Sequence, residues 1–384
     1  MLLSNILTKP PKSRSAVNVL IVDDSSVFRT AIKAALREQP NIKIAGSAQN
    51  GEIALKILRE TPIDWVILDM EMPILDGLQT LIEMQKEKFE ARVLIFASSS
   101  VDTYPRIRRC LELGAVDFIV KPDSDSASSV AESIQKIRDE LIPLLSCENS
   151  KPSSPLETPP VQKPVAEAPR PSEGEVGQRK SFEAIVIASS TGGPVALERL
   201  CSGLQGQVTL PIFIVQHIAA PFTRTLAERL SLVSGVPVAE AVDGERVVAG
   251  KIYVAPGDFH MELVASGSDV LVQLNKSEKI NFVRPAADPL FESAAKIYGE
   301  NLLSFVLTGM GADGLEGTRA VQEGGGKVII QDKETSVVWG MPGAVHAASR
   351  FDAMASLDEC SQALTLASRK STIDFKNWSL NPWK

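Results

Sequence analysis

The feature that most constrains the fold of this chain is a proline-rich stretch that divides it in two. Residues 147–180 (CENSKPSSPLETPPVQKPVAEAPRPSEGEVGQRK) are dense in proline and almost free of aliphatic clusters. Such a stretch cannot bury enough apolar area to offset the loss of chain entropy, and its prolines keep it extended. We therefore predict an interdomain linker over residues 143–180. A chain of 384 residues has room for one domain on either side.

Before this linker, short apolar runs alternate with segments of helical spacing. The runs predict strands at Val17–Val22, Ile42–Ala48, Trp65–Asp69, Val93–Ala97 and Asp117–Val120. The spacing predicts helices at Val27–Glu38, Ile53–Glu60, Leu78–Lys86, Pro105–Leu113 and Ser129–Leu141. Continuous apolar strands between helices are typical of a parallel sheet that is covered on both faces. We expect an α/β domain over residues 17–142, preceded by a flexible tail at residues 1–16.

The same alternation restarts after the linker. Strands are predicted at Ala184–Ser189, Ile212–His217, Lys251–Ala255, Phe305–Leu307 and Lys327–Gln331. Helices are predicted at Pro194–Leu200, Pro221–Leu232, Pro289–Tyr298, Gly314–Glu323 and Pro342–Ala348. A small hairpin of Val270–Leu274 with Phe282–Val283 is expected beside the main sheet. The pattern predicts a second α/β domain over residues 181–370 and a tail at residues 371–384.

Composition narrows the classes of function. A net charge of −7 argues against a broad nucleic-acid-binding face. The four cysteines are scattered along the chain, and this spacing argues against a zinc site and against a disulfide framework. It suits a protein of the reducing cytoplasm. No run approaches the ~20 apolar residues of a membrane helix, and the first residues lack the apolar core of a signal peptide. We expect a cytoplasmic monomer that inserts no segment into a membrane.

Charged side chains gather at the predicted strand ends of the first domain. Asp23 and Asp24 follow the first strand, Asp69 ends the third, and Lys121 follows the fifth. The carboxyl ends of parallel strands share one edge of the sheet, so these side chains should lie close together. Clustered carboxylates suit Mg²⁺, an aspartate can accept a phosphoryl group, and a lysine can bind its oxygens. Taken alone, Asp23 and Asp24 can also simply cap the helix that follows.

A serine turn is the richest segment of the second domain. In IVIASSTGGPVALERL (185–200), an apolar strand runs into two serines, a threonine and two glycines before Pro194 opens a helix. A serine on such a turn is exposed, and the nearby helix N-terminus favours developing negative charge. A phosphate-binding turn or a merely tight turn remains the alternative. Neither GxxxxGK[ST], GxGxxG nor GxSxG occurs within residues 185–200.

A nucleophilic serine needs a base and an acid that orients it. The three histidines are His217, His260 and His346, and only His217 ends a buried-looking strand, PIFIVQH. Asp313 follows another apolar strand in FVLTGMGADGLEGT (305–318), although it can also serve only as a helix cap. The three strand-end loops together predict a Ser–His–Asp arrangement. Glycine-rich loop amides, with Met310 among them, can form an oxyanion hole.

The first domain resembles the receiver domains of response regulators. The resemblance rests on VDDS (22–25), LDMEMPILDGL (68–78) and LGAVDFIVKP (113–122), and it implies a flavodoxin-like fold over residues 17–142. It also implies that Asp69 is the phospho-acceptor and that Asp23 and Asp24 hold Mg²⁺ with Asp69 and the Glu71 carbonyl. Lys121 would contact the phosphoryl group. The switch hydroxyl would be Ser98, with Ser99 as the alternative.

The second domain resembles the chemotaxis protein-glutamate methylesterases of the CheB family. The shared motifs are SSTGG (189–193), VQH (215–217), YVAPGDFHM (253–261), DPLFESAA (288–295), LTGMGADG (307–314) and QDKETSVVWGMPGAV (331–345). The resemblance implies a doubly wound, Rossmann-like sheet with Ser190 as nucleophile, His217 as base and Asp313 as orienting acid. Thr191 would support His217, and the Met310 amide would bind the oxyanion. Ser189 stands where the family usually has glycine, and QHIAAP (216–221) replaces the commoner QHMP.

The resemblance further implies a function and its partners. The substrates would be methylated helices of chemoreceptor cytoplasmic domains, whose glutamyl methyl esters are hydrolysed and certain glutamines deamidated. A histidine kinase would be the phosphodonor, Mg²⁺ the cofactor of the receiver, and the esterase site would need none. Our hypothesis is that the unphosphorylated receiver covers the site. The alternatives are a non-enzymatic binding module, a transcription regulator, which lacks a basic helix-turn-helix signature, and a nucleotide-binding domain, which lacks a phosphate loop.

Overall fold

The computed structural model describes residues 16–98, 100, 103–122, 130–145, 179–369 and 373–374. The chain divides into two compact units, which are described separately below. Most of the predicted tails and linker lies outside the described residues, as does the alternative switch residue Ser99. Among the helices of the described ranges, none combines the length and the apolar character needed to cross a bilayer.

The N-terminal sheet has five strands in the order β2-β1-β3-β4-β5. Its strands are β1 (Val17–Val22), β2 (Ile42–Ala48), β3 (Trp65–Asp69), β4 (Arg92–Ala97) and β5 (Asp117–Val120). β1 pairs in parallel with β2 and β3, and β3 pairs in parallel with β4. Each of these strands was predicted to within one residue, because continuous apolar runs are buried on both faces of a parallel sheet.

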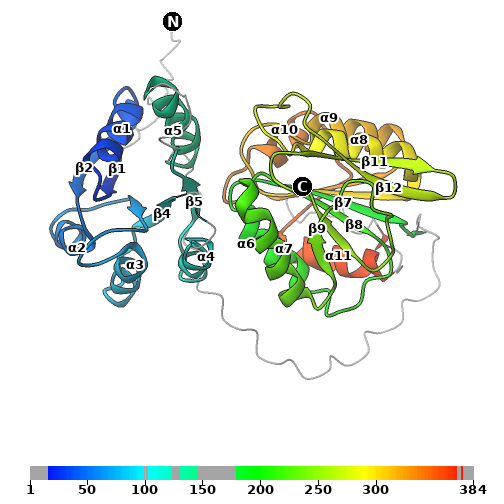
Figure 1. Cartoon of the computed structure of the whole chain (residues 1–384), viewed down its shortest axis with the longest axis horizontal. Helices are drawn as coiled ribbons and strands as arrows, with labels where there is room; N and C mark the ends of the chain where they lie inside the picture. The colour runs from blue at the N-terminus through cyan, green and yellow to red at the C-terminus, as the bar shows by residue number, and fades with distance from the viewer. Residues whose placement is uncertain are drawn as a thin grey trace, which may run out of the picture. The chain divides into compact units, whose positions relative to one another are not determined.

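Helices cover both faces of this sheet. They are α1 (Ser26–Leu36), α2 (Gly51–Glu60), α3 (Gly77–Lys86), α4 (Tyr104–Glu112) and α5 (Val130–Leu145). α1 packs beside α5, and α2 packs beside α3 (Figure 1). The start of α3 is fixed by a reciprocal cap, in which the Asp76 carboxylate accepts from Gln79 N–H and the Gln79 side chain accepts from Asp76 N–H. α5 continues to Leu145, three residues into the predicted linker.

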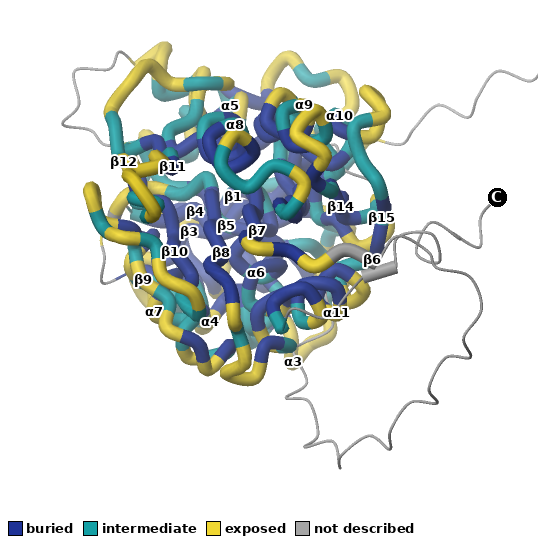
Figure 2. Tube along the Cα trace, turned by 90° about the vertical axis from the view of Figure 1, so that its right-hand side faces the viewer, coloured by how far each residue is buried: buried dark blue, intermediate teal, exposed yellow. Residues whose placement is uncertain are grey.

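The C-terminal sheet has seven parallel strands in the order β15-β14-β13-β7-β8-β10-β9. The strands are β7 (Ala184–Ser189), β8 (Ile212–Gln216), β9 (Val238–Glu240), β10 (Ile252–Val254), β13 (Leu302–Val306), β14 (Lys327–Gln331) and β15 (Ala353–Ala355). β7 and β8 are fully buried at the centre of the unit (Figure 2). The predicted parallel sheet is confirmed, and β9 and β15 are short strands that the sequence did not reveal.

Two helical layers enclose this sheet. The helices are α6 (Gly193–Ser202), α7 (Ala220–Ser234), α8 (Ala287–Tyr298), α9 (Leu315–Glu323), α10 (Met341–Ala347) and α11 (Leu357–Ser368), with a short 3₁₀ turn, η2 (Gly299–Asn301), after α8. α6, α7 and α11 bury apolar side chains such as Leu197, Leu226 and Leu364 in one core. α8, α9 and α10 bury Phe291 and others in a second core on the opposite face. A helix layer on each face confirms the predicted doubly wound α/β fold.

The predicted hairpin is wrong in its partner. The hairpin pairs β11 (His260–Ser266) with β12 (Asp269–Asn275) in antiparallel register. Its two-residue turn contains Gly267 at φ 61°, which is the conformation that tight hairpin turns require. Phe282, expected in the second strand, is instead exposed. A second small pairing, β6 (Arg179–Lys180) with β16 (Ile373–Asp374), joins residues from the predicted linker and tail.

Both large sheets have a point at which the direction of strand addition reverses. In the first sheet it lies between β1 and β3, and in the second it lies between β7 and β13. At such a point the loops at the carboxyl ends of the two neighbouring strands run in opposite directions and leave a crevice. The polar residues singled out in the sequence follow β1, β3, β7, β8 and β13.

Candidate active site

An acidic cluster lies at the reversal point of the first sheet. One carboxylate oxygen from each of Asp23, Asp24 and Asp69 lies within 4.8 Å of the others. Asp23 and Asp69 are almost fully buried, at 1% and 2% exposed. Asp23 Oδ1 accepts the Ser25 N–H at 2.8 Å, and Asp69 Oδ1 accepts the Glu71 N–H at 3.2 Å. Three like charges this close, two of them away from water, suit a hard divalent cation with oxygen ligands.

The predicted switch residues lie at two further strand ends. Ser98 follows β4, and its Oγ lies 3.1 Å from Thr103 Oγ1. Lys121 follows β5, and its N–H donates to the Ala97 carbonyl at 2.7 Å. Their positions in the chain are those that the sequence predicts. Their roles toward a phosphoryl group stay predictions.

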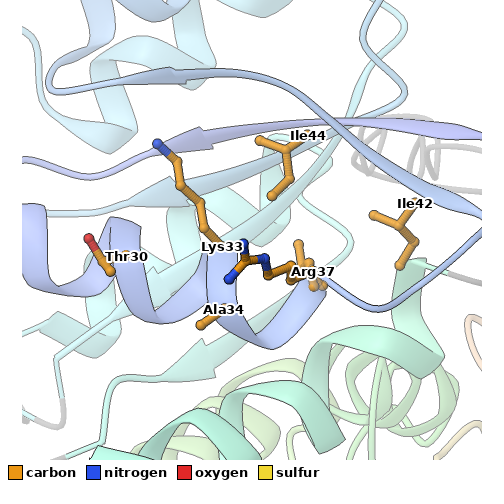
Figure 3. A pocket seen from close by; sticks show the side chains of 7 residues that line it. Thr30, Lys33, Ala34, Arg37, Ile42 and Ile44 are labelled. Atoms are coloured by element: carbon orange, nitrogen blue, oxygen red, sulfur yellow. The ribbon is translucent and has the colours of Figure 1, made fainter.

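A cavity elsewhere in the first unit does not take part in this site. It has a volume of about 500 Å³ and lies between α1 and β2 (Figure 3). Figure 3 shows Thr30, Lys33 and Arg37 on the helix, and Ile42 and Ile44 on the strand. None of the predicted site residues lines it. Its basic and apolar lining residues therefore give no indication of the chemistry at the strand ends.

In the second unit, the serine turn lies between β7 and α6. Gly192 has φ 74°, and a Cβ there would lie 2.7 Å from Val337, so the turn requires glycine. Ser190 is half-buried, its N–H donates to the Thr308 carbonyl at 3.0 Å, and its carbonyl accepts the Gly193 N–H at 2.7 Å. The turn thus holds Ser190 against the loop after β13.

Gln216 joins the serine turn to the end of β8. Its Nε2 donates to the Ser190 carbonyl at 2.8 Å and to the His217 carbonyl at 3.1 Å. Its Oε1 accepts from Ser189 Oγ at 2.7 Å, and both side chains are buried. One amide therefore ties the backbone of Ser190 to that of His217. The sequence showed Gln216 only as part of a motif, and the buried hydroxyl of Ser189 had no predicted role.

The structure brings His217 and Asp313 together. His217 Nε2 lies 2.7 Å from Asp313 Oδ2, and the two side chains are 9% and 2% exposed. Because Nε2 faces the carboxylate, Nδ1 is the ring nitrogen left to exchange a proton with a hydroxyl. A bond from Ser190 Oγ to His217 is not among the hydrogen bonds of the described residues. Such links are often long before substrate binds.

The first turn of α8 holds the Asp313 carboxylate. Oδ2 accepts the Ala287 N–H at 2.6 Å, and Oδ1 accepts the Asp288 N–H at 3.3 Å. Burial alone would raise the pKa of Asp313, but the hydrogen bond and charge of His217, together with these two N–H groups, lower the pKa below its ordinary value. Asp313 is therefore an anion at neutral pH. The cap of α9 is Gly314, so the side chain of Asp313 serves α8 rather than its own helix.

Asp288 is a second buried carboxyl beside Asp313, and it was noticed in the sequence only as part of a shared motif. Its Oδ1 accepts the Gly317 N–H at 2.7 Å, and its Oδ2 lies 3.5 Å from Asn281 Nδ2. Burial, and after it the charge of Asp313, raises the pKa of Asp288 to about 7. The pair thus has one acid held ionised and one that binds a proton near neutral pH.

The other two histidines have structural contacts. His260 is 1% exposed, with Nε2 3.0 Å from the Glu278 carbonyl and Nδ1 accepting the Ala286 N–H at 3.2 Å. These bonds fix a neutral ring with its proton on Nε2. His346 lies between the rings of Trp339 and Phe351. His217 is therefore the histidine best placed to act as a base.

The loop after β13 packs directly against Ser190. A Cβ on Gly309 would lie 2.7 Å from Ser190 Cβ, so only glycine fits there. Met310 follows, and no acceptor among the described residues takes its N–H. That N–H can therefore serve an incoming oxyanion. The Thr191 carbonyl accepts from Thr308 Oγ1 at 2.9 Å, but no bond from the Thr191 side chain to His217 is seen within the described ranges.

The fold and its polar clusters indicate a response regulator whose second domain is a doubly wound α/β sheet with the polar groups of a hydrolase at its strand ends. Residues 19–130 match the family model of the response regulator receiver domain, and residues 185–364 match that of CheB methylesterase. The chain is 41% identical over 344 residues to protein-glutamate methylesterase/protein-glutamine glutaminase 2 of Caulobacter vibrioides, covering 89% of this chain and 96% of that protein.

A second relative supports the same family, and one solved structure is reported with it. Protein-glutamate methylesterase/protein-glutamine glutaminase 1 of Paramagnetospirillum magneticum is 37% identical over 382 residues, covering 95% of this chain and all of that protein. The crystal structure of the Thermotoga maritima CheB methylesterase catalytic domain is 44% identical, covering 48% of this chain and 98% of that one, with a TM-score of 0.47. The chain belongs to the CheB family of protein-glutamate methylesterases/protein-glutamine glutaminases.

Proposed function

We propose that this chain is a phosphorylation-activated protein-glutamate methylesterase. It hydrolyses glutamyl methyl esters, and deamidates specific glutamines, on the cytoplasmic domains of chemoreceptors. The observation that carries the proposal is the 2.7 Å contact between His217 Nε2 and Asp313 Oδ2, at strand ends that flank the Ser190 turn. The names of the relatives supply the substrate class.

The chemistry is an acyl transfer in two steps. Nδ1 of His217 takes the proton of Ser190 as Oγ attacks the ester carbonyl carbon, and Asp313 stabilises the imidazolium that forms. The C–O bond to the methoxy group then breaks, and His217 returns the proton so that methanol leaves. Water, deprotonated by His217, attacks the acyl-enzyme carbonyl carbon. The bond to Ser190 Oγ then breaks, His217 returns the proton to Oγ, and the product is a free glutamate. The Met310 N–H stabilises the oxyanion of each tetrahedral intermediate, and Thr191 supports the base.

The receiver domain supplies the control. Asp69 accepts the phosphoryl group from a histidine kinase, and Lys121 and Ser98 bind its oxygens. Asp23, Asp24 and Asp69, with the Glu71 carbonyl, would hold Mg²⁺, and the ion would supply positive charge to neutralise the phosphoryl group. The close spacing of the three carboxylates supports this assignment. The receiver spans residues 17–142 and the esterase domain residues 181–370, and phosphorylation shifts the receiver away from a state that blocks the site.

The test is methanol release from methylated chemoreceptor membranes, with and without a small phosphodonor and Mg²⁺. Ser190→Ala should abolish release, whereas Asp69→Asn should keep basal release and lose the stimulation. Circular dichroism of both variants serves as the folding control. If the wild-type chain releases no methanol from a receptor shown to be methylated, the proposed activity is wrong. The hypothesis of a non-enzymatic binding module then takes its place.

A further inference from the structure

A tight turn after β12 is built in an unusual way. Ile280 N–H donates to the Val283 carbonyl at 3.2 Å, and Val283 N–H donates to the Ile280 carbonyl at 3.0 Å. The two residues inside the turn, Asn281 and Phe282, have φ of 51° and 66°. Turns with two successive residues at positive φ strongly favour Asn-Gly, because glycine alone adopts this conformation without strain. Here phenylalanine occupies the position that glycine prefers.

The side chain of Phe282 gains nothing from the fold in return for this strain. It is 95% exposed, the highest value among the exposed large hydrophobic side chains of the described residues. In the described part of the second unit, no other large apolar side chain that is exposed lies at positive φ. A strained aromatic residue that packs against nothing is a candidate for a contact made with another molecule.

The base of this turn is rigid. The His260 ring bonds the Glu278 carbonyl and the Ala286 N–H, so one buried side chain fastens both ends of the loop. Arg284 donates to the Lys276 and Ser277 carbonyls, at 3.1 and 2.8 Å, and pairs with the Asp258 carboxylate at 2.7 Å. A loop held in this way fixes the backbone that carries Phe282, which lowers the entropy cost of binding.

The same loop leads directly to the active site. Asn281 Nδ2 lies 3.5 Å from Asp288 Oδ2, and the Asp288 N–H donates to Asp313. The adjacent Ala287 N–H also donates to Asp313, the acid that holds His217. The turn that carries Phe282 and the acid of the site are therefore fixed to the same end of α8.

We propose that Phe282 is a docking residue for the protein substrate. Its ring packs against an apolar side chain on the substrate helix that carries the modified glutamate. The inference rests on the proposed function. A helix presents side chains three and four residues apart on one face, so an apolar residue on the face that carries the ester is the partner that we infer for Phe282, whose turn is fixed to the same end of α8 as Asp313. Phe282 determines affinity for the receptor and takes no part in the chemistry.

The experiment compares Phe282→Ala, Phe282→Gly and Phe282→Leu in the full chain. Membranes holding a methyl-accepting chemoreceptor with tritiated methyl esters supply the protein substrate, and p-nitrophenyl acetate supplies a small ester that has no receptor helix attached. The alanine and glycine variants should raise KM for the receptor about 10- to 100-fold, which is the effect of burying one phenylalanine side chain. Their kcat and their rate on the small ester should not change.

Two controls separate docking from folding. Phe282→Gly relieves the strained φ, which offsets the extra entropy of glycine in the unfolded chain, so its melting temperature should not fall while its receptor affinity does. Leu232 on α7 is also apolar and 77% exposed, and Leu232→Ala should leave KM unchanged. Phe282→Leu keeps an apolar side chain and should restore most of the affinity.

The outcomes are distinct. A wild-type chain that releases methanol, together with an unchanged KM in Phe282→Ala, overturns the docking role and leaves the proposed function in place. A loss of small-ester activity in Phe282→Ala overturns it as well, because the residue would then act on the site itself. A wild-type chain that releases no methanol overturns both.

Discussion

Replacing Asp288 by asparagine should make the second unit more stable at neutral and alkaline pH. The Asp288 carboxyl is 5% exposed, and its Oδ1 accepts the Gly317 N–H at 2.7 Å. Burial is the larger cause and the charge of Asp313 the second, and together they raise the pKa of Asp288 from 3.8 to about 7. An asparagine keeps the acceptor for Gly317 and removes the ionisation. The variant therefore isolates the cost of charging this carboxyl.

The raised pKa determines the sign of the effect. A carboxyl whose pKa is higher in the folded chain binds its proton more tightly there, so stability falls as the pH rises from about 4 to about 7. A gap of about three pKa units, at about 1.4 kcal/mol each, lowers the free energy of unfolding by about 4 kcal/mol at pH 8. Of this loss, about 2–3 kcal/mol falls between pH 5 and pH 8.

The assay is urea unfolding of the wild type and Asp288→Asn at pH 5, 6, 7 and 8. The difference between the two free energies of unfolding should grow with pH by about 2–3 kcal/mol in favour of the variant. Asp243→Asn is a matched control, because Asp243 is exposed and its carboxylate also accepts one backbone N–H, from Leu274 at 2.8 Å. Parallel curves for wild type and Asp288→Asn would refute the reasoning.

Three further substitutions test the site. In Gly193→Ala, the new Cβ would overlap Gln216 Oε1. Displacing that amide should lower the free energy of unfolding in urea by about 2 kcal/mol and should lower methanol release. Equal stability of variant and wild type would contradict the close contact between Gly193 and Gln216. Asp313→Asn cannot hold the imidazolium and should lower kcat about 10³–10⁴-fold with an unchanged circular dichroism spectrum; a loss below tenfold would argue against the role of the acid. Asp24→Asn should raise the Mg²⁺ concentration needed for labelling of Asp69 by a small phosphodonor, and an unchanged Mg²⁺ dependence would remove Asp24 from the metal site.

The sequence predicted the sheets well because their strands are continuous apolar runs. β1, β2, β3, β5, β7 and β14 have the predicted bounds, and the family resemblance is confirmed. Edge elements were harder. β15 is only Ala353–Ala355, and its pairing partner β14 lies more than twenty residues earlier, so no local pattern marks it. In the hairpin, the turn at Gly267 was the informative signal, and apolar Phe282 was a misleading one because its backbone strain is invisible in the sequence.

The site was predictable at the level of residues that follow strands, and less so at the level of contacts. Strand ends indicated the serine turn, His217 and Asp313, since neighbouring parallel strands end at one edge, and the family resemblance selected Ser190 within the turn. The contacts of Asp313 with the first turn of α8 depend on a helix 25 residues earlier in the chain, and no spacing rule reaches that far. The bridging role of Gln216 likewise depends on β7 and β8 lying side by side.

The way in which Asp313 is held has a consequence for how this enzyme tolerates genetic change. Apart from His217, its recorded donors in the described structure are peptide N–H groups, those of Ala287 and Asp288. A point mutation replaces a side chain but leaves the peptide group, so almost any residue at 287 or 288 can still supply the donor. Only proline removes an N–H. Substitutions in α8 can therefore accumulate without removing the N–H groups that orient Asp313 and keep it ionised.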